Sequence, residues 1–196
     1  MKTAVMAAAA AMAAMAGAAQ AAVVTMDFED VAPAGGYLNG AAGAVLHEED
    51  GYVATTVGGT VYLDDAGLYN AHFDTDYVYV GANGAVAVTA ADGAAFDLAS
   101  FDAAAETLGG AFGLQVSFVL TDGTVSTRAF VVSAAETFAL GLVGVVSATF
   151  LSTSGTGAID ALAFCTVDAA PVPLPAAAWL FASGAGVLAA RRGRKA

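Results

Sequence analysis

The 196-residue sequence contains only one cysteine and two histidines, and these shortages exclude several classes of protein. With Cys165 alone no intramolecular disulfide can form, so the fold depends on a hydrophobic core. No Cys/His cluster has the spacing of a zinc site, and no Gly-x-Ser-x-Gly motif is present. His47 begins an acidic run that we interpret as a solvated loop, and His72 precedes a predicted strand. We therefore expect a protein that is not an enzyme.

Basic side chains are nearly absent from the middle of the chain. Five of the six lie at the extreme ends, whereas Ala22–Ala170 contains all 18 acidic residues and only Arg128 as a base, a net charge of −17. Such a surface repels nucleic-acid phosphates and acidic lipid headgroups. We therefore exclude nucleic acid as a partner and attribute the acidity to solubility or to cation binding.

Residues 1–21 have the three parts of a secretory signal peptide. Lys2 gives a positive start, Ala4–Ala16 is an apolar run, and the small residues Ala19 and Ala21 suit cleavage after Ala21. A permanent anchor helix is the alternative, but the weakly hydrophobic run is shorter than the ~20 residues that span a bilayer. The sequence therefore predicts export.

The C-terminal segment 171–196 has a Pro-rich motif, an apolar stretch and a basic cluster, in that order. Prolines hold Pro171–Pro175 extended. The uncharged segment 176–190 is near the lower length limit for a transmembrane helix. A basic cluster stops such a helix in the membrane with the cluster in the cytoplasm; its members are Arg191, Arg192, Arg194 and Lys195. An ordinary tail anchor behind a linker is the alternative interpretation.

The Pro-rich motif also resembles a known sorting signal. Val172, Pro173, Leu174, Pro175 and Ala176, followed by a short helix and arginines, are similar to the VPLPA-CTERM variant of the PEP-CTERM signals. The resemblance covers residues 172–195. It implies recognition by an exosortase, a membrane-embedded transpeptidase, in a Gram-negative bacterium. It also implies inner-membrane anchoring before processing, followed by transfer to the cell surface or an extracellular exopolysaccharide matrix.

Between residues 22 and 170 the dominant hydrophobic period is two, which is typical of strands. Phe112–Leu120, the turn Asp122-Gly123 and Val125–Val132 predict a hairpin. Other strands are predicted at Val24–Glu29, Val53–Val57, Thr60–Leu63, Tyr77–Val80, Ala85–Thr89, Phe96–Phe101, Val143–Leu151 and Ile159–Val167. Many short strands separated by glycine turns predict one all-β domain over residues 22–170, a jelly-roll-like antiparallel β-sandwich.

The apolar run Phe138–Leu151 is the one internal segment that could suggest a second membrane span. It contains Gly141 and Gly144, is rich in valine and lacks flanking basic residues. We therefore interpret it as a core strand.

Acidic residues supply the oxygen ligands that calcium prefers. A carboxylate that closes the first strand and one that opens the last can converge in a jelly roll, so we predict a structural calcium held partly by Glu29 and Asp160. The further acidic candidates, none with EF-hand spacing, are Asp30, Asp64, Asp65, Asp74 and Asp76. No other cofactor is predicted.

A second, looser resemblance concerns the middle of the chain. Phe96–Phe101 and Val145–Phe164 resemble strands of the ectodomains that often precede such tails, which are jelly rolls similar to carbohydrate-binding modules. In those domains an early acidic residue and a late Ile-Asp pair often share calcium. Here Ala161 stands where an amide usually follows the aspartate.

These patterns favour a structural or adhesive protein of the cell surface or matrix. One alternative is a carbohydrate-binding module that retains exopolysaccharide. Its ring platforms would be tyrosines, although we interpret Tyr77 and Tyr79, on one face of a strand, as core or cross-strand packing. A second alternative is a secreted hydrolase, which requires two carboxylates about 5–10 Å apart across a cleft.

Overall fold

A computed structural model describes residues 23–29, 37–39, 41–64, 73, 75–106 and 110–165. These residues belong to a compact unit, Ala22–Val167, and form twelve strands and no helix. The predicted signal peptide, sorting motif, transmembrane helix 176–190 and basic cluster lie outside the described residues, as does His72. Within the described ranges, no helix has the length and hydropathy of a membrane span.

All the strand pairs are antiparallel. The strands, in chain order, are β1 (Val23–Met26), β2 (Tyr37–Asn39), β3 (Val45–Glu49), β4 (Tyr52–Gly58), β5 (Val61–Asp64), β6 (Tyr77–Val80), β7 (Ala85–Ala90), β8 (Phe96–Ala105), β9 (Phe112–Leu120), β10 (Val125–Val132), β11 (Glu136–Ser154) and β12 (Gly157–Cys165).

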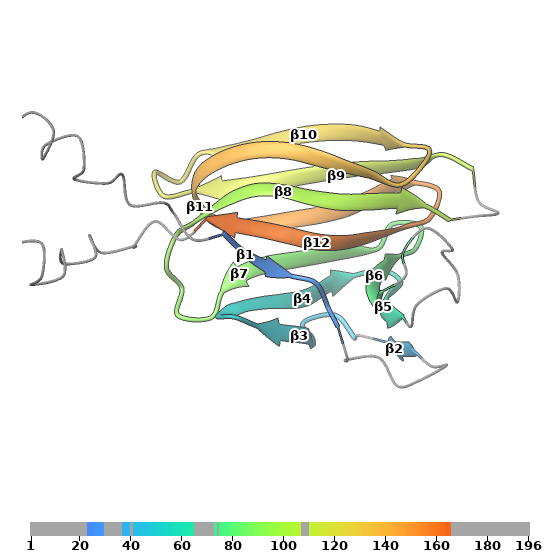
Figure 1. Cartoon of the computed structure of the whole chain (residues 1–196), viewed down its shortest axis with the longest axis horizontal. Helices are drawn as coiled ribbons and strands as arrows, with labels where there is room; N and C mark the ends of the chain where they lie inside the picture. The colour runs from blue at the N-terminus through green and yellow to red at the C-terminus, as the bar shows by residue number, and fades with distance from the viewer. Residues whose placement is uncertain are drawn as a thin grey trace, which may run out of the picture. The chain divides into compact units, whose positions relative to one another are not determined.

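Strand β11 belongs to two layers at once. Its first half, up to Val145, pairs with β8, whereas its second half pairs with β9 on one side and β7 on the other. Register shifts interrupt the β8 pairing between the halves, where Gly141 and Gly144 adopt φ values of 58° and 69° that cost glycine little. The result is one layer of β2-β5-β6-β12-β8-β11, with β1 beside β12, and another of β10-β9-β11-β7-β4-β3 (Figure 1).

Aromatic side chains from both layers meet between them. Phe101 of β8 contacts Phe150 of β11 and Phe130 of β10, with ring centroids 5.2 and 5.5 Å apart. Tyr52 of β4 stacks on Phe164 of β12 at 3.8 Å. Full burial of one such ring contributes about 1.5–3 kcal/mol. These contacts confirm the predicted all-β antiparallel sandwich, and they place Phe138–Leu151 in a strand, as predicted.

The sequence pattern misses β2 and β3. The interpretation of His47 and its acidic neighbours as a solvated loop is wrong, because the run lies in β3. A register shift between Val45 and His47 breaks the alternation that would have revealed this strand. The His47 side chain is only 11% exposed, and its Nε2 lies 3.1 Å from Glu49 Oε2. Its ring also packs against Phe28, with centroids 5.4 Å apart.

Candidate functional site

Two aspartates lie opposite each other on neighbouring strands. Asp160 of β12 is in register with Asp102 of β8, and the preceding pair is Ile159 with Ala103. Ile159 and Ala103 both belong to the hydrophobic core. Because side chains alternate along a strand, Asp102 and Asp160 project from the opposite, outer face of their layer.

The same row continues across β6 and β5. Ile159 pairs with Val78, so Asp160 follows beside Tyr77, and Tyr77 is in turn opposite Asp64. Tyr77 Oη donates a hydrogen bond of 3.2 Å to Asp64 Oδ2, and both residues are 0% exposed. We call Asp64, Tyr77, Asp160 and Asp102 the polar row.

Asp160 lies at a break in the edge of β12. On that edge β6 pairs as far as Ile159, and β1 pairs from Leu162 onward. Between these residues the β8 pairing shifts register, and Ala161 adopts a left-handed φ of 46°. Such a bulge re-aims a side chain, which here is the carboxyl group of Asp160.

Two hydrogen bonds hold the Asp160 carboxyl group, which is only 5% exposed. Thr75 Oγ1 donates to Oδ2 at 2.8 Å, and the Ala161 N–H donates to Oδ1 at 2.7 Å. Burial, together with the charges of Asp102 and Asp27, raises the pKa of Asp160 to about 7, although the two hydrogen bonds act to lower it. The site therefore favours either a protonated Asp160 or a nearby cation.

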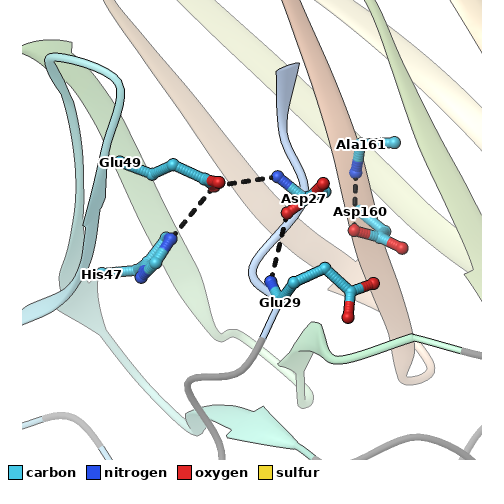
Figure 2. Close-up of polar contacts among 6 residues, drawn as sticks. All are labelled: Asp27, Glu29, His47, Glu49, Asp160 and Ala161. Atoms are coloured by element: carbon cyan, nitrogen blue, oxygen red, sulfur yellow. Dashed lines mark hydrogen bonds and ion pairs between the residues drawn. The ribbon is translucent and has the colours of Figure 1, made fainter.

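The end of β1 brings two more carboxylates to this region. Glu29 N–H donates to Asp27 Oδ1 at 3.2 Å, and Asp27 N–H donates to Glu49 Oε2 at 3.1 Å. Phe28, between them, has a left-handed φ of 59°. Figure 2 shows the Glu29 side chain extending from the end of β1 toward the strand that carries Asp160.

These positions test whether the predicted pair suits calcium. Glu29 follows the end of β1, and Asp160 lies in β12 two residues before Leu162, the partner of Met26. The groups around them carry oxygen atoms, the ligand type that calcium takes. The described residues nevertheless hold no group of three or more His, Cys, Asp or Glu arranged for a metal. Asp30, Asp65 and Asp74 lie outside the described residues. The calcium site with Glu29 and Asp160 among its ligands therefore stays a prediction.

A second cross-strand row lies beside the polar row on the same face. Tyr62 of β5 is opposite Tyr79 of β6, which is opposite Ala158 of β12. The two tyrosine rings stack with centroids 5.3 Å apart and 13° between their planes. Tyr77 is fully buried, so packing explains the alternating tyrosines as the sequence predicts. Tyr62 and Tyr79 are half-buried.

Comparison with known proteins adds a fold likeness but no family. No protein-family model and no curated protein matches the chain. Two solved structures, both variants of a family 29 carbohydrate-binding module, are 14% and 15% identical to it. Each covers 73% of this chain, and the matches span 84% and 91% of those chains, with a TM-score of 0.38 in both cases. Likenesses this weak do not assign a function.

Proposed function

We propose that the chain is an exported, non-enzymatic protein whose jelly-roll-like β-sandwich serves a structural or adhesive role at the cell surface or in the extracellular matrix. The observation that carries the proposal is the order of three features in residues 172–195: proline motif, apolar segment and basic cluster. An exosortase-like enzyme and, transiently, the inner membrane are its partners before release.

The extent of the folded unit supports this account. The compact unit begins at Ala22, the residue after the predicted cleavage site, and ends at Val167, before Pro171 opens the proline motif. Removal of both ends would leave the sandwich strands uncut, because β1 begins at Val23 and β12 ends at Cys165.

The role of the proline motif can be tested in the host. A Pro173→Ala/Pro175→Ala double variant is expected to keep its tail and stay in the inner-membrane fraction, whereas wild type leaves that fraction. Pro171→Ala, just outside the matched motif, is the control and should behave as wild type. Release of the double variant at the wild-type rate would refute sorting through this motif.

We further propose that a calcium ion stabilises the junction of β1, β6 and β12. Glu29 and Asp160 would supply carboxylate oxygens to it. Its charge would offset the repulsion among Asp27, Asp102 and Asp160, a repulsion that no basic side chain from β1, β6, β8 or β12 relieves. The ion would stabilise the fold and take no part in a reaction.

A carbohydrate-binding module is the second candidate, supported by the half-buried Tyr62 and Tyr79 pair. Aromatic rings present apolar faces with polar rims, which suit sugar rings. The net charge of −17 over Ala22–Ala170 favours a neutral glycan, because uronate polymers would be repelled. Affinity electrophoresis in neutral polysaccharide should retard wild type, and Tyr62→Ala should lose the retardation. Equal mobility with and without polysaccharide would exclude this function.

The hydrolase alternative is less well supported. A hydrolase of this type requires two carboxylates that face each other across a cleft. The best candidate pair is Asp102 and Asp160, but these lie side by side on one sheet face. At 5% exposure Asp160 is also poorly accessible to a substrate.

A further inference from the structure

Strand β10 is an exposed sheet edge. Among the described residues it pairs only with β9, and the register runs from Val125 opposite Val119 to Val132 opposite Phe112 without a shift. Figure 1 shows β10 along one margin of the fold and β3 along the opposite margin. Val125 and Val131, near its two ends, are 65% and 76% exposed. The strand is therefore long, regular and open along one side.

The open side of β10 presents backbone hydrogen-bonding groups. The Leu120 N–H donates to the Thr124 carbonyl at 2.9 Å, which fixes that pair as a hydrogen-bonded one. Hydrogen-bonded pairs alternate with non-bonded pairs along an antiparallel ladder. The N–H and C=O groups of Thr127, Ala129 and Val131 therefore point away from β9, toward the open edge.

The other sheet edges carry features that discourage pairing with another chain. At the far side of the same layer, β3 has a bulge and two glutamates, Glu48 and Glu49. In the other layer β1 and β2 have only four and three residues. The first half of β11 is interrupted by register shifts, and its Leu140 carbonyl accepts a hydrogen bond of 2.9 Å from Arg128. Bulges, charges and short length are the usual protections of an edge, and β10 has no bulge, acid or proline.

Charge also singles out this part of the molecule. Between Gly110 and Ile159 the only charged residues are Asp122, Arg128 and Glu136, a net charge of −1. The other 16 of the 18 acidic residues lie outside that segment. Two copies of so acidic a protein repel each other least when they approach through β9, β10 and β11.

We propose that two copies of this chain associate by antiparallel pairing of β10 with β10, which extends one layer into a continuous sheet across a two-fold axis. The docking strand must carry no acidic residue and have an open edge of its own. Strand β10 meets both conditions, and its one charged residue, Arg128, is hydrogen-bonded to the Leu140 carbonyl of its own chain. A two-fold axis closes the assembly at two copies, since each copy uses the one edge that is unprotected among its described strands. The favoured register sets Ala129 opposite Ala129 of the second copy, because the register centred on Arg128 would oppose two like charges.

Cysteine cross-linking of the full chain in the host envelope tests this pairing directly. In a Cys165→Ser background, Ala129→Cys should form a disulfide-linked dimer under a mild oxidant, because directly opposed residues lie within disulfide reach. Val45→Cys is the matched control on edge strand β3, 60% exposed, and should stay monomeric. A cross-link from Ala129→Cys to a different protein, or equal dimer from both variants, would overturn the proposal.

Sedimentation of the full chain in detergent gives an independent readout. Wild type should sediment as two copies, and added salt should tighten the dimer because like-charge repulsion is screened. Val131→Lys should weaken association at least about tenfold, whereas Val45→Lys should not. The melting temperatures of both variants, compared with wild type, show whether a loss of association comes from unfolding. Wild type that is monomeric at every salt concentration, or a dimer indifferent to Val131→Lys, would refute β10 pairing.

Discussion

Asp102 and Asp160 lie directly opposite each other on β8 and β12, on the face of the sheet that points away from the core. Like charges in this arrangement destabilise a sheet. The fold nevertheless holds this pair in place, because Asp160 is almost fully buried and hydrogen-bonded to Thr75. The buried position of Asp160 beside Asp102 and Asp27 favours a proton on Asp160 or a cation close by, and both possibilities lead to measurements.

Calcium should raise the melting temperature of chelator-treated protein, since a ligand that binds only the folded state stabilises it by about 2.7 kcal/mol at a hundred times its Kd. Glu29→Gln and Asp160→Asn should each reduce the effect. Asp122→Asn is the control, because Asp122 lies in the β9–β10 turn. Calorimetry that detects no binding, together with an unchanged melting temperature, would contradict the calcium prediction.

Without calcium, stability should fall as pH rises from about 4 to about 7. The pKa of Asp160 is raised from 3.8 to about 7 in the folded state, so the folded protein holds a proton that the unfolded chain has lost. The stability present below the unfolded value is lost toward the folded value, at up to about 1.4 kcal/mol per pH unit. Urea titrations at several pH values should show this slope in wild type and a shallower one in Asp160→Asn. Identical slopes in wild type and Asp160→Asn would mean that a group other than Asp160 takes up the proton.

Ala161→Gly should stabilise the protein by roughly 0.5–1 kcal/mol. Alanine at a φ of 46° has a strained backbone, and glycine relieves that strain at some entropic cost. Thermal unfolding measures the gain. The control is Ala163→Gly two residues on, which has no left-handed φ and should lose stability. Loss of stability in Ala161→Gly would show that the methyl group matters more than the backbone strain.

Tyr77→Phe should cost about 1–3 kcal/mol, because Asp64 loses a donor in a fully buried setting. A double-mutant cycle with Asp64→Asn isolates the pair from the other contacts of both residues. The expected coupling in urea unfolding is at least about 0.5 kcal/mol. Additive losses would mean that the hydroxyl–carboxylate contact contributes nothing of its own.

The sequence predicts most of the sandwich because alternation and turn residues are local signals. The hairpin of β9 and β10 matches its predicted bounds, since Asp122-Gly123 and regular alternation agree. The sequence does not predict β3, because a bulge interrupts its alternation of apolar and polar residues, and it does not predict β2, which has only three residues. The run Phe138–Leu151 is predicted as a strand, but its change of layers near Gly141 and Gly144 is not, because that change depends on which strands pair with each half of β11.

The candidate site is only partly visible in the sequence. Glu29 and Asp160 can be chosen because one closes the predicted first strand and the other opens the predicted last one. In the structure β1 already ends at Met26, before the left-handed Phe28, and β12 already begins at Gly157. Asp102 and Tyr77 cannot be chosen from the sequence, because their positions beside Asp160 depend on which strands pair and in what register. That register is a long-range property, and no local pattern specifies it. The bulge at Ala161 is likewise invisible, because alanine is not a residue expected at a left-handed φ.

The most direct test of the account is the intact mass of the protein recovered from its native host, measured separately for each cell fraction. The account predicts a species that begins at Ala22, ends near Pro175 and lies outside the inner membrane. A species in the inner membrane that retains Trp179 and the terminal arginines would contradict it, because the tail would then be a permanent anchor.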